Sequence, residues 1–579
     1  MCGICAGIGK NQTQKVVDGL KKLEYRGYDS SGIAFLLKEE IEIIKSVGQI
    51  KNLEKMLEKR DEKVFDANIV IGHTRWATHG GVCEENAHPH ISENGEFAMV
   101  HNGIIENYQQ IKKGLSVELK SQTDTEVFVN LVEGQNGTAL QRLISACQKV
   151  EGSFAVAVLC KDCQQIFLAK KASPLMVAVS KDEVMAASDI SVFSGRFDEC
   201  FSLDDGEFAV MSEGNVEFFD LSGERIEKEK ITIKEFDYPE ENLQESHFML
   251  KEIKEQPVVL RRTFFKFLAE DVNVEELKKF KTFHFVACGT AYHSCLLGAR
   301  YLESFCEKKC RVSVASEFRY AAKIFPKNCL YVFVSQSGET ADTIACAKLV
   351  KEKGCKVLCV TNVPYCTLNS LADFVIPTYA GKEVAVASTK AYTAQVLTLL
   401  ILACRLSGDF PQELLKQFVF KWQIQSFDMG LSEEILKYKK IFFIGRGQDY
   451  VTSLEAALKL KEIAYVNCLG IAAGELKHGS LALVDDKTLV VAISTQEELR
   501  EKMESNMLEV KARGGKILLV SQMKHNLHVD FEIVLPKMDE RLMSIVSIVP
   551  LQQLAFEYST ALGFNPDRPR NLAKSVTVE

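Results

Sequence analysis

A cysteine directly follows the initiator methionine, and its type and position suit covalent catalysis. Removal of Met1 would leave Cys2 with a free α-amine beside its thiol, so that one residue would supply both nucleophile and base. The ordinary pKa values of an α-amine, about 7.7–8.0, and of a thiol, about 8.5, allow proton transfer between the two near neutral pH. Any short second residue permits the same removal of Met1. Taken by itself, Cys2 is therefore more simply interpreted as an ordinary structural residue.

Five polar motifs downstream change the interpretation of Cys2. They are YRGYDSSG (25–32), GHTRWATHG (72–80), NAHPH (86–90), HNGIIENY (101–108) and SQTDTE (121–126). With CGI at the start, they resemble the glutaminase domain of N-terminal-nucleophile glutamine amidotransferases over about 230 residues. Chance agreement of five spaced motifs is negligible.

The resemblance implies a role for each matching residue. Cys2 would attack the glutamine side-chain amide and form a thioester, with its own amine as the base. Asn102 and the backbone N–H of Gly103 would form the oxyanion hole, although Asn-Gly elsewhere is commonly a turn. Arg75 would bind the α-carboxylate of glutamine as a bidentate donor, and Asp124 its α-ammonium. The other glutamine-binding positions that it implies are Trp76, Thr78, His79 and His88.

Residue type alone would give these last positions a simpler interpretation. An isolated Trp is more often a core aromatic, and an isolated His more often a structural one. In the family, the residue matching Trp76 gates the passage for ammonia.

The string SQSGETADT in the C-terminal half suggests a second binding site. It follows the apolar stretch YVFV and opens a helical pattern, where hydroxyls and free backbone N–H groups attract anions. Such residues are usually plain helix caps, but the whole string resembles sugar isomerase (SIS) domains. That resemblance implies phosphate binding by Ser335, Gln336, Ser337 and Thr340, and further sugar contacts from Thr290, Val386 and Ser388. Many relatives have Ser where this chain has Ala291, so no ligand hydrogen bond is assigned there.

The segment SLEAALKLKEIAY predicts an amphipathic helix whose charged residues share one face. Glu455, Lys459 and Glu462 are spaced i, i+4 and i+7, a pattern that more often forms a solvated ion-pair stripe. This helix, the segment GELKHGSLALVD and the tail DRPRNLAKSVTVE resemble the glutamine:fructose-6-phosphate aminotransferase family.

On that resemblance, which spans essentially the whole chain, the C-terminal half converts the sugar. Lys574 would form a Schiff base with the C2 ketone of fructose 6-phosphate. Glu462 would move the proton between C1 and C2, His478 would assist ring opening and Lys459 would support the site. In the family the matching His comes from the neighbouring subunit, which implies a homodimer or a higher homo-oligomer.

The elements that must position these residues differ between the two halves. Short apolar runs in residues 2–235 predict antiparallel sheets, and the resemblance implies an α+β N-terminal-nucleophile (Ntn) hydrolase αββα sandwich. After a linker at 236–246, strands alternate with helices and predict two α/β doubly wound parallel-sheet SIS domains, 247–425 and 426–565, before a catalytic tail, 566–579. Ligands of such sheets bind at the carboxyl ends of the strands. The stretch from Cys306 to Val314 carries no motif and is expected to be a loop.

The composition excludes several other classes of protein. A net charge of −8 provides no basic field for nucleic acid or an anionic membrane. The longest apolar run, Val396 to Cys404, is about half of the ~20 residues that cross a bilayer and is expected to be a buried helix. Without a signal-peptide pattern we expect a cytoplasmic protein with reduced cysteines. Cys160 and Cys163 form one CxxC without a second metal-binding pair, so no metal is expected. The reaction that the resemblance implies needs no organic cofactor either.

Three alternative functions compete with amination of fructose 6-phosphate. A different acceptor would require an acidic phosphoribosyl-diphosphate loop or the SGGxDS loop of asparagine synthetases, and neither motif occurs. A sugar-phosphate sensor would need the phosphate-binding segment but no Schiff-base lysine. An isomerase or deglycase would not need the N-terminal half.

Overall fold

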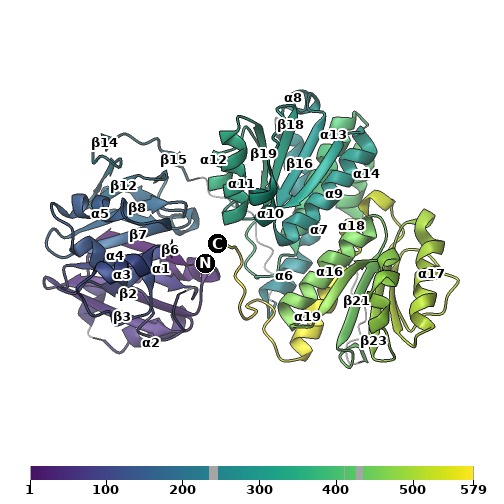
Figure 1. Cartoon of the computed structure of the whole chain (residues 1–579), viewed down its shortest axis with the longest axis horizontal. Helices are drawn as coiled ribbons and strands as arrows, with labels where there is room; N and C mark the ends of the chain where they lie inside the picture. The colour runs from purple at the N-terminus through teal and green to yellow at the C-terminus, as the bar shows by residue number, and fades with distance from the viewer. Residues whose placement is uncertain are drawn as a thin grey trace. The chain divides into compact units, whose positions relative to one another are not determined.

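The computed structural model describes residues 2–60, 62–77, 79–233, 245–270, 272–409, 411–424 and 434–577. The chain divides into two compact units, made mainly of Met1–Asp237 and of Tyr238–Lys574 (Figure 1). Most of the predicted linker, 236–246, and the predicted boundary at 425–426 lie outside the described residues.

Two antiparallel sheets form the middle of the N-terminal unit. The first has the spatial order β15 (Ile231–Thr232), β11 (Glu199–Ser202), β9 (Met176–Val179), β10 (Glu183–Ala187), β1 (Gly3–Gly9), β4 (Ile69–Arg75), β2 (Ser30–Leu37) and β3 (Glu40–Val47). The second has the order β14 (Arg225–Ile226), β13 (Asn215–Phe219), β12 (Phe208–Ser212), β8 (Gln165–Lys171), β7 (Gly152–Cys160), β6 (Phe97–Ile105) and β5 (His90–Ile91).

Alternating side chains explain why these strands stack into layers. On β4, Val70 packs toward helices α1 (Gln12–Leu23) and α2 (Ile50–Leu57), whereas Ile71 packs between the sheets. Helices α3 (Tyr108–Gly114), α4 (Asp124–Glu133) and α5 (Ala139–Cys147) lie against the second sheet. The predicted αββα sandwich is therefore confirmed, and β1 places Cys2 at the end of a central strand.

Two parallel sheets organise the C-terminal unit. The first has the spatial order β17 (Lys309–Val314), β16 (Thr282–Ala287), β18 (Cys329–Ser335), β19 (Lys356–Thr361) and β20 (Phe374–Pro377). The second has the order β22 (Cys468–Ala472), β21 (Lys440–Gly445), β23 (Thr488–Ser494), β24 (Lys516–Ser521) and β25 (Phe531–Val534). When the five strands of each sheet are numbered in chain order, from β16 in the first and β21 in the second, both sheets have the spatial order 2-1-3-4-5. This shared order supports the predicted duplication. In each sheet the switch point, where a ligand binds in such folds, lies between strands 1 and 3.

Helices cover both faces of these sheets. One large core joins the facing sides of the two sheets through α7 (Gln256–Ala269), α9 (Gly289–Cys306), α13 (Lys390–Ser407), α16 (Gln448–Ala464) and α19 (Ile548–Ala561). The outer faces are covered by α10 (Ala315–Ala321) and α11 (Ala341–Glu352) on one sheet and by α17 (Arg500–Lys511) on the other. Short α6 (Phe248–Lys254) precedes α7, and the remaining α-helices among the described residues are α8 (Val274–Lys278), α12 (Thr367–Ser370), α14 (Gln412–Lys421) and α18 (Met543–Val546).

The apolar run Val396 to Cys404 lies within α13 and is buried, as predicted. Among the described residues, no helix is both long and apolar enough to span a bilayer.

The prediction of a loop from Cys306 to Val314 is wrong. Lys309–Val314 forms β17, which pairs in parallel with β16 at the edge of its sheet. An edge strand is covered less completely than a central one, and its residues are half-buried or exposed, so it lacks the continuous apolar run that marks the central strands.

Candidate active sites

Cys2 lies where β1 begins, beside the end of β4. Gly3 pairs with Thr74, so the thiol is held next to Trp76, whose backbone N–H donates to Cys2 Sγ at 3.2 Å. Burial raises the pKa of the Cys2 thiol, while the Trp76 N–H and the Arg75 guanidinium favour the thiolate. Met1 lies outside the described residues, as does Thr78, one of the predicted glutamine-binding positions.

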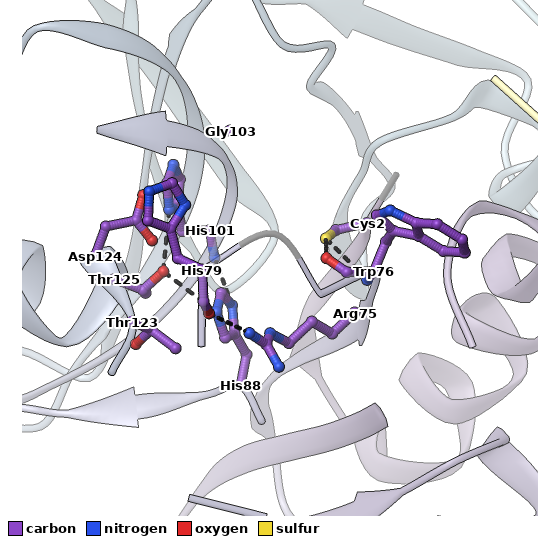
Figure 2. Close-up of a pocket in the computed structure, with 10 residues that line it drawn as sticks. All are labelled: Cys2, Arg75, Trp76, His79, His88, His101, Gly103, Thr123, Asp124 and Thr125. Atoms are coloured by element: carbon purple, nitrogen blue, oxygen red, sulfur yellow. Dashed lines mark hydrogen bonds between the residues drawn. The ribbon is translucent and has the colours of Figure 1, made fainter. Parts of the chain in front are cut away.

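A pocket beside Cys2 gathers most of the predicted glutamine-binding residues. Figure 2 shows Cys2 and Trp76 on one side of it, Asp124 on the other and the Arg75 guanidinium directed between them. The lining residues are Cys2, Arg75, Trp76, His79, His88, His101, Gly103, Thr123, Asp124 and Thr125. The sequence analysis did not single out His101, Thr123 or Thr125.

Opposite charges face this pocket from two different elements. Arg75 ends β4 and donates to the carbonyl oxygens of His79 at 2.5 Å and Gly81 at 3.2 Å. Asp124 is the first residue of α4 and accepts from the Ile105 N–H at 2.9 Å. A guanidinium and a carboxylate lining one pocket suit the two charged groups of an amino acid.

Asn102 and Gly103 lie on β6, and only Gly103 lines the pocket. Gly103 has φ +138°, and a Cβ there would come within 2.0 Å of the Ser153 carbonyl oxygen, so a side chain is excluded. The Asn102 amide nitrogen donates to the Cys2 carbonyl oxygen at 3.1 Å and to Ser188 Oγ at 2.9 Å. The amide is thereby held within reach of the cysteine.

Four buried histidines form a cluster that reaches Asn102 through His73. They are His73, His88, His90 and His101, and burial lowers the pKa of each. These imidazoles are therefore neutral at physiological pH. His79 instead lies half-buried at the pocket, edge-on to Tyr108.

The phosphate-binding segment predicted for the C-terminal unit forms the turn between β18 and α11. Ser335 Oγ lies 3.2 Å from Thr340 Oγ1 and accepts from the Gly338 N–H at 3.0 Å. Gly338 has φ +69°, and a Cβ there would meet Cys366 Sγ at 2.1 Å. Ser335, Gln336, Ser337 and Thr340 thus lie at the carboxyl end of strand 3, beside the switch point.

The charged face of α16 is buried, so the solvated ion-pair interpretation is wrong. Lys459 and Glu455 have 0% side-chain exposure, and Lys459 Nζ lies 3.4 Å from Glu455 and 2.7 Å from Glu462. Thr290 on α9 donates to Glu455 and accepts from Lys459, each at 3.0 Å. Burial raises the pKa of Glu462, which favours its protonated form.

The C-terminal tail docks on the first parallel-sheet domain. Asp567 accepts the backbone N–H groups of Phe248 and Met249 at the start of α6, and its carbonyl oxygen accepts from Val386 N–H at 3.1 Å. Further along the tail, Lys574 Nζ forms an ion pair with Glu383 and lies 3.2 Å from Ser388 Oγ. The tail thus brings Lys574 to the loop that contains Val386 and Ser388.

Glu383 was missed by the sequence analysis. It accepts the backbone N–H groups of Thr389 and Ala391 as well as the Lys574 ammonium, and although it is buried, Lys574 lowers its pKa to about 2. A carboxylate just before the VAST motif was the available signal. His478, by contrast, lies exposed at the end of η4 (Ala473–His478), and no contact brings it to Glu462 among the described residues of this chain.

Comparison with known proteins defines the class of this chain. Residues 73–195 match the family model of the glutamine amidotransferase domain, and residues 276–405 and 434–561 each match that of the SIS domain. The sandwich with a cysteine at a strand end, followed by two parallel sheets, is therefore a glutamine amidotransferase domain joined to two SIS domains.

Full-length relatives define the family more narrowly. The chain is 42% identical to glutamine–fructose-6-phosphate aminotransferase (isomerizing) of Caldanaerobacter subterraneus subsp. tengcongensis and 40% identical to that of Clostridium acetobutylicum, with all of each chain covered. It therefore belongs to the glutamine–fructose-6-phosphate aminotransferase family. A solved C-terminal domain of glucosamine-fructose-6-phosphate aminotransferase from Francisella tularensis is 33% identical, with a TM-score of 0.52, and matches 57% of this chain and 100% of that one.

Proposed function

We propose that this protein converts D-fructose 6-phosphate and L-glutamine to D-glucosamine 6-phosphate and L-glutamate. The observation that carries the proposal is the buried Lys574 beside Glu383 and Ser388, in a unit that also contains the phosphate-binding segment. A docked amine of this kind suits Schiff-base chemistry and has no evident use in a sugar-phosphate sensor.

The glutaminase reaction is assigned to the pocket beside Cys2. The thiolate attacks the side-chain carbonyl of glutamine, the free α-amine of mature Cys2 accepts the thiol proton and passes it to the leaving ammonia, and water then hydrolyses the thioester. Asn102 Nδ2 and the Gly103 N–H stabilise the oxyanion, for which Asn102 must exchange one of its present acceptors for the substrate oxygen. Arg75 binds the α-carboxylate and Asp124 the α-ammonium, with Trp76, Thr78, His79 and His88 completing the site.

The sugar reaction is assigned to the C-terminal unit. Ser335, Gln336, Ser337 and Thr340 bind the phosphate, and Thr290, Val386 and Ser388 bind the sugar. His478 assists ring opening, Lys574 condenses with the C2 ketone, and ammonia replaces Lys574 at C2. Glu462 then takes a proton from C1 and returns a proton to C2, while Lys459 balances its charge.

Ammonia has to travel between the two sites without entering water, because free ammonia near neutral pH is mostly protonated and no longer a nucleophile. An internal passage gated by Trp76 meets this need. None of these steps requires a metal or an organic cofactor.

We further propose a cytoplasmic homodimer or higher homo-oligomer. The exposed position of His478 supports this assembly, since the residue is accessible to a neighbouring subunit. The domain boundaries 2–235, 247–425 and 426–565, with the tail 566–579, stay predictions.

Product analysis tests the proposal directly. The full-length protein is incubated with glutamine and fructose 6-phosphate, and we expect glutamate and glucosamine 6-phosphate in equal amounts. Release of glutamate without any hexosamine phosphate would indicate a different acceptor for the ammonia. Isomerisation of the sugar phosphate without consumption of glutamine would indicate an isomerase. Intact mass should show loss of Met1, because a retained methionine would block the amine that serves as base.

A further inference from the structure

The most informative group outside the assigned machinery is His73, the fully buried member of the histidine cluster. Its imidazole has 0% exposure and stacks on His88, with ring centroids 4.1 Å apart. His73 lies on β4, two residues before Arg75, and has no role in the proposed reaction. Its ring nevertheless forms a hydrogen bond with the side chain of Asn102.

Both hydrogen bonds of the His73 ring to described groups are made by the same nitrogen. His73 Nε2 lies 3.0 Å from the His101 carbonyl oxygen and 3.0 Å from Asn102 Oδ1. Burial lowers the pKa of His73 to about 3, so the ring is neutral and carries one proton. Because a carbonyl oxygen only accepts, that proton is on Nε2, and Nδ1 has no hydrogen-bond partner among the described groups.

This tautomer determines which way the Asn102 amide faces. A donor at His73 Nε2 requires the amide oxygen of Asn102 on its side, which turns the amide nitrogen toward Cys2. A reversed amide would set its N–H₂ group against the His73 N–H and its oxygen against the Cys2 carbonyl. Two buried mismatches of this kind would be costly.

We propose that His73 is a positioning residue for the glutaminase reaction, in which its Nε2–H holds the Asn102 amide so that Nδ2 faces the reacting carbonyl. This inference rests on the proposed role of Asn102 in the oxyanion hole. When Nδ2 leaves the Cys2 carbonyl oxygen for the oxyanion, the bond from His73 to Oδ1 persists and keeps the amide from rotating. Such preorganisation acts on the transition state rather than on glutamine binding.

The test is a double-mutant cycle on glutamine hydrolysis. His73→Leu removes the donor and should lower kcat about 10–100-fold with little change in KM, since loss of a whole oxyanion donor costs about 10²–10³-fold. His73→Gln, whose amide can donate from a similar position, should restore part of the loss. In an Asn102→Ala background, His73→Leu should cost less than about twofold, because the amide that it orients is gone.

A matched control uses His90, a comparably buried imidazole of the same cluster that contacts Thr123 Oγ1 at 3.0 Å. His90→Leu and Asn102→Ala should have independent effects, which separates loss of a buried imidazole from loss of the His73 contact. Alkylation of Cys2 by iodoacetamide needs no oxyanion hole, so unchanged labelling of His73→Leu would show that the pocket is folded.

The outcomes distinguish this inference from the proposed function. If His73→Leu lowers kcat equally in the parent protein and in Asn102→Ala, or raises KM without changing kcat, the positioning role of His73 is overturned. The proposed function would be unaffected by either result. An Asn102→Ala variant with full activity would refute the oxyanion role itself. If His73→Leu does not fold, a kcat that His73→Gln lowers equally with and without the Asn102→Ala change overturns the inference.

Discussion

Glu252 shows how one buried carboxyl can depend on a neighbouring ion pair. Its Oε1 accepts from the Val384 and Ala385 N–H groups, and its Oε2 has no partner among the described groups. Burial, and secondly the charge of Glu383, raise the pKa of Glu252 to about 8. Protonated Glu252 therefore leaves Glu383 and Lys574 as a balanced ion pair beside the loop that contains Val386 and Ser388.

This shift predicts a stability that falls as pH rises. Between about 4.5, the ordinary value, and about 8, folded Glu252 keeps a proton that the unfolded chain has released, so the unfolding free energy decreases across that window and levels off above it. Glu252→Gln is neutral at every pH. We expect it to be more stable than the parent by on the order of 1–2 kcal/mol at pH 8.5 and equal to it near pH 5, measured by denaturant unfolding.

Glu255→Gln is the control for this prediction. Glu255 pairs with buried Lys390 at 2.6 Å, so its neutralisation should destabilise the protein instead. Parallel pH profiles for Glu252→Gln and the parent would show that Glu252 is ionised in the folded protein.

At the scale of elements, α16 performs two tasks with adjacent faces. Its apolar side packs in the large core, with Ala456, Leu460 and Ile463. On the charged side, Glu455 and Lys459 contact Thr290 of α9, and Glu462 pairs with Lys459. The i, i+4, i+7 spacing was sufficient to predict that these charges share a face. Their burial follows from α9, which covers that face and supplies Thr290 and His293, the latter 2.6 Å from Glu455.

Replacing Lys459, the cation on this face of α16, should strongly lower the stability of the protein. Lys459→Met removes the cation between the buried Glu455 and Glu462, and we expect a loss of about 3–5 kcal/mol in unfolding free energy together with loss of sugar conversion. Lys461→Met, two residues along the same helix at an exposed position, should change stability by less than about 0.5 kcal/mol. Similar losses for the two variants in denaturant unfolding would contradict a buried role for Lys459.

At the scale of the whole molecule, two compact units carry two reactions. Cys2 and its pocket belong to the antiparallel sandwich, and Lys574, Glu462 and the predicted phosphate-binding segment belong to the parallel-sheet unit. Each unit has cores of its own, so a point change in one site need not unfold the other.

The two reactions should therefore separate by mutation. Cys2→Ala should abolish glutamine hydrolysis and leave isomerisation of the sugar phosphate measurable, because only the thiol is lost. Lys574→Ala should abolish sugar conversion and retain some glutaminase activity. Glutamate release and sugar isomerisation are assayed separately on each variant; loss of both reactions in either one would show that the sites do not work independently.

Much of this protein could be predicted from its sequence because the signals are local. Short apolar runs and strand–helix succession predicted the antiparallel sheets and the two parallel sheets. The family resemblance implied the sandwich and most of the residues that line the pocket beside Cys2. The edge strand β17 was missed, since half-exposed residues carry no continuous apolar run.

Only the tertiary structure decided the partners of the predicted residues. Glu383 lies 191 positions from Lys574, and His73 lies 29 from Asn102, so no local pattern joins them. Burial of Lys459 and neutrality of the histidine cluster likewise depend on elements packed from elsewhere in the chain. The sequence thus determined which chemical groups are present and on which strand or helix each one lies, whereas long-range packing decided their contacts, solvation and protonation.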